Sequence, residues 1–175
     1  MKSSHLEIQG VAIMMKDLKD QLVLTMDAFD INKVKFDLEP IEYLNKPTSA
    51  LWTSSVQKDE KGEVSSEWRE WCIDENFANP YSRRRTILIP KKDTKVFQLN
   101  WKTEKELLTK RSRPRFIFAA YHVDWSALVE AGYDGFNLPC RTGLGMLLGG
   151  CDFSAWDCES TVWFNTDWID RIVTL

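Results

Sequence analysis

The stretch from residue 46 to residue 72, KPTSALWTSSVQKDEKGEVSSEWREWC, constrains the fold most, because it specifies three consecutive elements. Residues 50–55 are short, aromatic and rich in β-formers, which predicts a strand. Residues 57–64 are polar around a central glycine, as in an exposed turn. Ser66 is a suitable helix N-cap, and two acidic residues follow it in the first turn. We therefore expect a strand, a charged loop and a capped helix here.

The predicted helix carries an aromatic stripe. Trp68, Trp71 and Cys72 are spaced i, i+3 and i+4, so they share one face of the helix. The chain has eight tryptophans in 175 residues. Large aromatic rings in a globular protein form the core or the walls of a groove. We assign most of these tryptophans to the core.

The rest of the chain alternates short strands with short helices. Further strand-like segments cover residues 21–29, 86–90, 96–99, 116–121 and 159–165. Helical patterns are found around Val11 to Leu18, after the capping box at Thr103, from Asp124 to the glycine at 132, and over residues 167–173. Pro40 and Pro47 bracket what we interpret as a connection. Without repeats or linkers, this order predicts one mixed α+β domain spanning residues 1–175.

Composition excludes several classes of protein. The net charge of -3 gives no reason to expect nucleic-acid binding by bulk electrostatics. No apolar run reaches the roughly 20 residues of a membrane span, and the N-terminus lacks the apolar region of a signal peptide. We expect a cytoplasmic protein without a membrane partner.

The four cysteines show no CxxC pair, and the chain has only two histidines, so no metal site is expected. We interpret the cysteines as mostly buried, reduced thiols. A disulfide between two of Cys140, Cys151 and Cys158 stays open.

No complete catalytic motif is present. A nucleophile elbow and an HExxH motif are both absent from the sequence, and the glycine-rich residues 141–150 match neither GxGxxG nor a P-loop. We interpret that segment as a flexible or closely packed loop. Cysteine–histidine catalysis through His122 stays open, although a lone histidine is more often structural. The residues by themselves therefore do not specify a reaction.

Two basic clusters are candidates for a contact surface. One consists of Arg83, Arg84 and Arg85 before a strand, and the other spans residues 110–115 and includes Arg113. Forked guanidinium groups suit phosphates and carboxylates, so both clusters fit contact with an acidic partner. The alternative is a solvated strand end or loop.

Three segments taken together resemble the ADP-ribosyltransferase-like superfamily, in the small diverged form common among bacterial and phage proteins. They are ALWTSS followed by SEWREWC, then AGYDGFNLP, and finally ESTVWFNTDWI. Their order matches that of the family. The resemblance implies a split pair of small, mostly antiparallel sheets with flanking helices, and NAD bound in the cleft between the sheets.

The resemblance also implies site residues. Trp52 and Ser54 of the middle strand would contribute to the nicotinamide pocket, and Tyr133 is a further ring for stacking. Family members carry His, Arg or Tyr in the first strand. Residues 21–29 contain none of these, and Thr25 or Asp27 is the nearest polar candidate.

The late strand offers two candidates for the catalytic position, Glu159 and Ser160. Side chains of a strand alternate between faces, so a shift of one residue decides which of them faces the cleft. An active protein would transfer ADP-ribose from NAD to a protein or nucleic-acid acceptor, or hydrolyse NAD. The alternative is an inactive binding module, such as an inhibitor in the conflict between phages and bacteria.

Overall fold

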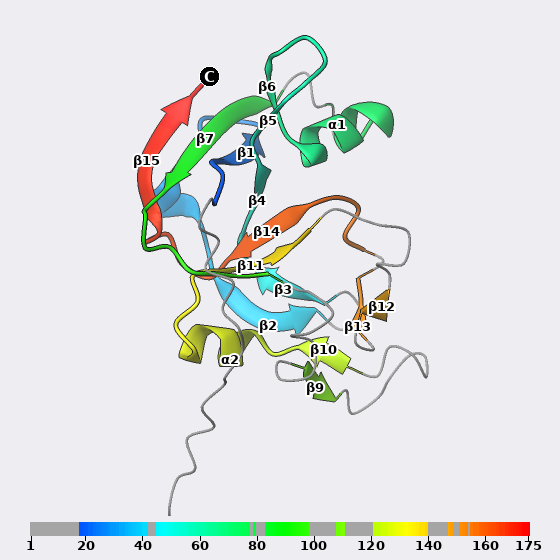
Figure 1. Ribbon diagram of the computed structural model, residues 1–175, viewed down its shortest axis with the longest axis vertical. Helices are drawn as coiled ribbons and strands as arrows, with labels where there is room; N and C mark the ends of the chain where they lie inside the picture. Colours follow the sequence, from blue (N-terminus) through cyan, green and yellow to red (C-terminus); the bar gives the residue numbers. More distant parts are fainter. Residues whose placement is uncertain are drawn as a thin grey trace, which may run out of the picture.

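The computed structural model describes residues 18–41, 45–77, 79, 83–98, 108–110, 121–139, 147–148, 151–153 and 155–175. These residues form a mixed α+β structure that is mostly sheet (Figure 1). The strands are β1 (Gln21–Thr25), β2 (Asp37–Ile41), β3 (Lys46–Ser49), β4 (Leu51–Ser55), β5 (Gln57–Lys58), β6 (Val64–Ser65), β7 (Arg84–Pro90), β8 (Val96–Gln98), β9 (Leu108–Lys110), β10 (Tyr121–Val123), β11 (Gly135–Leu138), β12 (Leu147–Leu148), β13 (Cys151–Asp152), β14 (Ser160–Trp163) and β15 (Ile169–Thr174). The helices are the 3-10 turn η1 (Ile31–Lys33), α1 (Glu67–Asp74) and α2 (Trp125–Glu130).

The largest sheet of the described residues is curled and has seven strands, in the order β15-β7-β1-β4-β14-β11-β8. Neighbouring strands are antiparallel except β11 and β8, which are parallel. In Figure 1 the sheet bends between β4 and β14, with α1 beyond one end and α2 below. Because of this order, β1, β4 and β14 lie side by side in the middle of the sheet.

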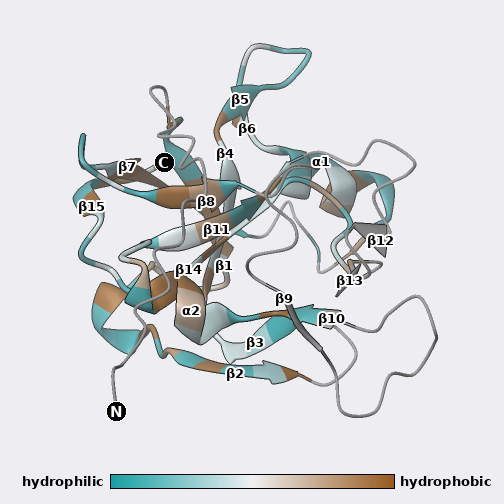
Figure 2. Ribbon diagram, turned by 60° about the horizontal axis from the view of Figure 1, so that its bottom comes forward, coloured by the Kyte–Doolittle hydropathy of each residue, from teal (hydrophilic) through white to brown (hydrophobic). Residues whose placement is uncertain are grey.

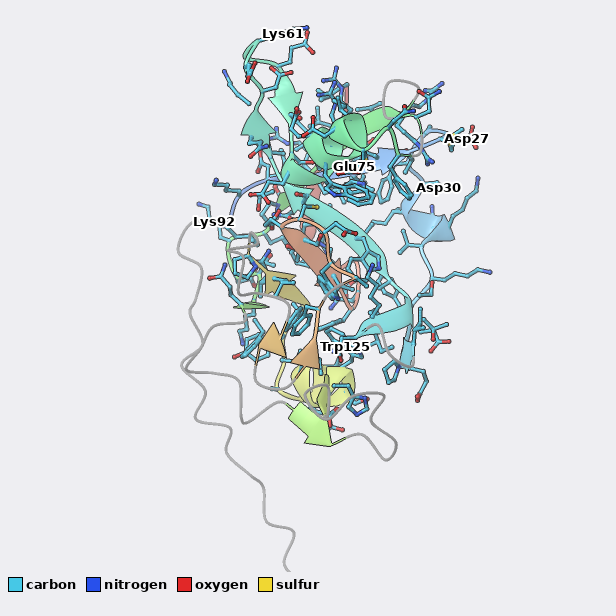
Figure 3. The ribbon with its side chains drawn as sticks, turned by 90° about the vertical axis from the view of Figure 1, so that its right-hand side faces the viewer. Asp27, Asp30, Lys61, Glu75, Lys92 and Trp125 are labelled. Atoms are coloured by element: carbon cyan, nitrogen blue, oxygen red, sulfur yellow. The ribbon has the colours of Figure 1, made fainter. Side chains whose placement is uncertain are left out.

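The local signals of residues 46–72 are confirmed. β4 is the predicted strand, and Ser66 caps α1 by accepting a hydrogen bond at Oγ from the Arg69 amide, at 3.2 Å. The polar loop is the turn of a hairpin between β5 and β6, and Figure 3 places Lys61 at its outer end. Asp124 caps α2 as predicted, and Gly132 follows this helix with a φ of +79°.

Several predicted segments differ from the structure. The helix expected over residues 167–173 is wrong, because a turn at residues 167–168 leads into the edge strand β15, which pairs with β7. Pro40 and Pro47 lie opposite each other in the β2–β3 hairpin, where a connection was expected. The helix expected after Thr103 was to include Leu108, but this residue begins the strand β9.

Other predictions fall on residues that the structure does not describe. These are residues 11–17 of the helix expected around Val11 to Leu18, residues 103–107, Arg113, residues 116–120 and most of residues 141–150. The pair Leu147–Leu148 of the last segment forms β12, where a loop was expected.

Two clusters of buried side chains form the core. One packs aromatic rings of β8, β11 and α2 around Phe136, and Figure 3 shows its member Trp125 at α2. The other packs Leu88 and Trp163 against Trp168, and the two tryptophan rings stack with centroids 3.5 Å apart. Figure 2 shows hydrophobic residues along β7, β8 and α2, and hydrophilic ones in the β5–β6 loop. Tryptophans therefore contribute to both clusters, as predicted.

Within the described part of the chain, no helix is long and apolar enough to cross a membrane. Cys72 and Cys158 are buried free thiols.

Candidate functional site

The middle strands bring together polar residues from distant parts of the sequence. β1 pairs with β4 so that Gln21 lies opposite Ser55, and β14 pairs with β4 through Thr161 and Thr53. The residues before β14 therefore lie next to the end of β4. Glu159 is the residue immediately before β14.

The Glu159 carboxylate is buried, with 9% of the residue exposed, and it is held by four hydrogen bonds. Oε2 accepts from the Ser54 hydroxyl and from the Ser55 amide, both at 2.7 Å. Oε1 accepts from Nδ2 of Asn137 at 2.6 Å and from the Ser55 hydroxyl at 3.2 Å. Donors from β4 and β11 thus fix the position of this carboxylate.

The network continues through β11 and β8. Asn137 also donates to Oγ1 of Thr161 at 2.9 Å, and its Oδ1 accepts from Nε2 of Gln98 at 2.9 Å. The backbone amide of Glu159 donates to Oε2 of Glu67, in the first turn of α1, at 2.9 Å. Four strands and one helix therefore contribute to a single polar cluster around Glu159.

Gln21 is the polar residue that β1 contributes to this site, and it was not among the residues expected from the sequence. It is fully buried, and its Oε1 accepts from Oγ1 of Thr53 at 2.7 Å. Its Nε2 donates to the carbonyl of Lys19 at 2.9 Å and lies 3.5 Å from the Ser55 hydroxyl. The sequence offered one signal for Gln21, namely a polar side chain at the start of an otherwise apolar strand. Thr25 lies at the other end of β1, where its hydroxyl donates to the carbonyl of Asp27.

A cavity of about 540 Å³ lies beside this cluster, between α1 and the strands β1, β3 and β4. Its walls carry the aromatic rings of Trp52, Trp68, Trp71, Phe77 and Trp156. The Trp68 and Trp71 rings are stacked with centroids 5.1 Å apart, as their spacing on one helix stripe allows. The polar side of the lining includes Lys46, Thr48, Asp157 and Ser160.

Lys46 is the cation of the cavity. Its Nζ lies 5.4 Å from the centroid of the Trp52 ring, and among the described residues no carboxylate lies within ion-pairing distance of it. Burial lowers the pKa of Lys46, and the negative charge of Asp157 acts in the opposite direction. An ammonium group in such surroundings interacts with the ring quadrupole and still has donors for an anion.

The structure separates the predicted residues into two groups. Ser54 and Glu159 meet in the polar cluster, whereas Trp52 and Ser160 line the cavity. The two late-strand candidates therefore have different surroundings. Tyr133 joins neither group, since its ring packs edge-on against Phe97, with centroids 5.5 Å apart.

The first basic cluster is partly engaged within the protein. Arg85 donates to the carbonyl of Val64 at 2.9 Å and lies 3.8 Å from the Glu63 carboxylate. Arg84 is exposed. Arg113 lies outside the described residues.

Thiol and metal chemistry receive no support from the described residues. Burial raises the pKa of Cys72 and raises the pKa of Cys158 to about 12, so both thiols are protonated at neutral pH and are poor nucleophiles. The part of the chain that the structure describes holds no group of three side chains suited to a metal ion.

Comparison with protein-family models gave no match, and comparisons with curated proteins and with solved structures gave no significant match either.

Proposed function

We propose that the protein binds NAD and cleaves the bond between nicotinamide and ribose, passing ADP-ribose to a macromolecular acceptor or to water. One observation carries the proposal: Ser54 and Glu159, which lie 105 residues apart in the chain, are joined by a 2.7 Å hydrogen bond. These are the residues that the resemblance to ADP-ribosyltransferases assigns to the middle strand and the late strand of one site. We propose accordingly that the curled sheet corresponds to the family's split pair of sheets.

The chemistry needs a fixed negative charge. When the C1′–N bond of NAD breaks, its electron pair moves to the nicotinamide ring and the ribose gains oxocarbenium character. The acceptor oxygen or nitrogen then bonds to C1′ and releases its proton. A carboxylate held in place beforehand stabilises the positive charge without reorganisation. The donors from Ser54, Ser55 and Asn137 hold Glu159 in this way.

The adjacent cavity supplies surfaces for the cofactor. Trp52 offers a ring for the nicotinamide, and Ser160 offers a hydroxyl next to Glu159 in the sequence. In this proposal Tyr133 and Thr25 do not contact NAD, because one packs in the core and the other lies at the far end of β1.

A second candidate function is binding without chemistry, and the saturation of Glu159 favours it. Each carboxylate oxygen already accepts two hydrogen bonds from the protein. A carboxylate in this state acts as a structural anchor for β4, β11 and β14. The protein would then bind a nucleotide-like ligand or a partner protein, as an inactive member of the fold does.

Calorimetry of NAD binding, with release of nicotinamide followed in the same sample, tests both candidates. Binding with release supports the transferase, and binding without release supports the inactive module. No binding at millimolar NAD overturns the transferase and leaves recognition of a partner protein as the remaining candidate. If release is found, Glu159→Gln should abolish it while Glu63→Gln, a surface control, should not. Near-ultraviolet circular dichroism of both variants checks that the loss is not a loss of folding.

A further inference from the structure

We propose that the aromatic cavity is a binding site for a flat aromatic ligand that carries a negative charge, with the rings of α1 contacting its face and Lys46 contacting its anionic group. The cavity shares Trp52 with the NAD site proposed above, but the inference stands on its geometry alone and requires no catalysis.

The shape of the cavity suits a small organic molecule. Its volume of about 540 Å³ falls within the range of about 300–1,000 Å³ found for small-molecule sites. Aromatic rings line it from three places in the sequence: α1 with the adjacent Phe77, the strand β4, and the segment before β14. Several ring faces and edges around one space provide stacking contacts for a planar ligand.

The aromatic wall is also incompletely covered. Phe77 is 48% exposed, and its ring packs against Trp68 and Trp71 at centroid distances of 5.8 and 5.3 Å. Trp68 and Trp71 are themselves only half-buried. These three large rings remain in contact with water, so the free energy falls when a flat apolar ligand covers them.

The position of Lys46 at the Trp52 ring sets the sign of the ligand group that lies beside it. Lys46 is partly removed from water, lies over the Trp52 ring, and has no ion-pair partner among the described residues. Asp157 also lines the cavity. A ligand anion that reaches Lys46 provides a charge-assisted hydrogen bond where the ammonium has lost part of its hydration. A cationic group at the same place would be repelled by Lys46, and the anionic group of the ligand must lie nearer to Lys46 than to Asp157, which carries the opposite charge.

The test compares two probes that differ only in charge, indole-3-acetate and indole-3-acetamide, by calorimetry on the whole protein. We expect the acetate to bind about tenfold more tightly than the amide, because one charge-assisted hydrogen bond contributes about that factor in affinity. Lys46→Met should bring the two affinities together, and Lys58→Met, on the exposed β5 strand, should leave the preference unchanged. Trp71→Leu should weaken the binding of both probes, since it removes one of the two stacked rings of α1.

The outcomes are distinct from those of the NAD experiment. Absence of binding by both probes at millimolar concentration overturns the cavity proposal, and so does a preference that survives in Lys46→Met. Urea unfolding of each variant shows whether it is folded, and Lys46→Arg, which keeps the charge, should retain the preference. Displacement of indole-3-acetate by NAD identifies the cofactor as a ligand of this class. Simultaneous binding of NAD and indole-3-acetate means that the ligand of the cavity is a molecule other than NAD. Either result supports the cavity proposal, whether or not nicotinamide is released.

Discussion

Replacing Glu159 by glutamine should destabilise the protein strongly, although the two side chains have nearly the same shape. The carboxylate accepts at both oxygens, whereas the amide accepts at one and donates at the other. If the amide nitrogen takes the place of Oε2, it faces the Ser55 backbone N–H, which cannot reorient. If it takes the place of Oε1, it faces Nδ2 of Asn137.

The magnitude follows from these contacts. In the second orientation Asn137 can turn its amide, but its Oδ1 then leaves the Nε2 of Gln98. Oε2 accepts two hydrogen bonds of 2.7 Å, and Oε1 accepts one of 2.6 Å and one of 3.2 Å, so either orientation loses two hydrogen bonds to a charged acceptor, at about 1.5 kcal/mol or more per bond. We expect a loss of about 3 kcal/mol in the free energy of unfolding. With a urea dependence of about 2 kcal/mol per molar, the unfolding midpoint should fall by about 1.5 M.

Urea unfolding followed by tryptophan fluorescence measures this change. Glu63→Gln is the matched control, because the Glu63 side chain is 58% exposed and its ion pair with Arg85 spans 3.8 Å. An exposed pair of this kind contributes less than about 1 kcal/mol. If the midpoint of Glu159→Gln lies as close to wild type as that of Glu63→Gln, the carboxylate is not an anchor of the sheet.

Three further predictions concern stability. The pKa of Cys158 is about 12 in the folded protein against a model-compound value of 9.0, so the unfolded state loses its proton first and stability should fall as pH rises from about 9 to 12. Cys158→Ala should lack this part of the pH dependence in urea titrations. The pKa of Lys46 is lowered below 10.5 by burial, so folding is penalised while the group is protonated. Lys46→Met should therefore unfold at higher urea than wild type at neutral pH, with an advantage that shrinks towards pH 10.5, and a constant difference would contradict this. Gly135→Ala should cost about 1–3 kcal/mol by overpacking, because a Cβ there would lie 2.8 Å from the Trp163 ring and 2.8 Å from the Val162 carbonyl; an unchanged melting temperature would contradict it.

The sequence predicted those elements whose signals are local. Ser66 and Asp124 cap their helices through hydrogen bonds to residues three positions further on, so the cap and its partner are read from one short window. Residues 167–173 are different. Their pattern allowed a short helix, but β15 forms because the exposed edge of β7, about 80 residues earlier, offers a ladder of backbone hydrogen bonds.

The candidate site shows the same limit. Ser54 and Glu159 were identified as separate residues through the resemblance, yet their hydrogen bond depends on the order of the strands in the sheet. Gln21 was missed because its role comes from the register that sets it opposite Ser55, and register is a property of the pairing rather than of either strand. The sequence therefore indicates the chemical groups of the site, whereas the contacts between them depend on the pairing of the strands.

The connections also indicate how an anchored carboxylate becomes available to a ligand. Three of the four hydrogen bonds to Glu159 are 2.6 or 2.7 Å long, and the fourth, from the Ser55 hydroxyl, is 3.2 Å. The Ser55 hydroxyl itself accepts from Nε2 of Gln21 at 3.5 Å. A ribose hydroxyl that approaches Oε1 therefore needs to replace only the longest bond, while Ser54, the Ser55 amide and Asn137 keep the carboxylate in place. Structural anchoring and catalysis at Glu159 are for this reason compatible, and turnover of NAD decides whether both occur.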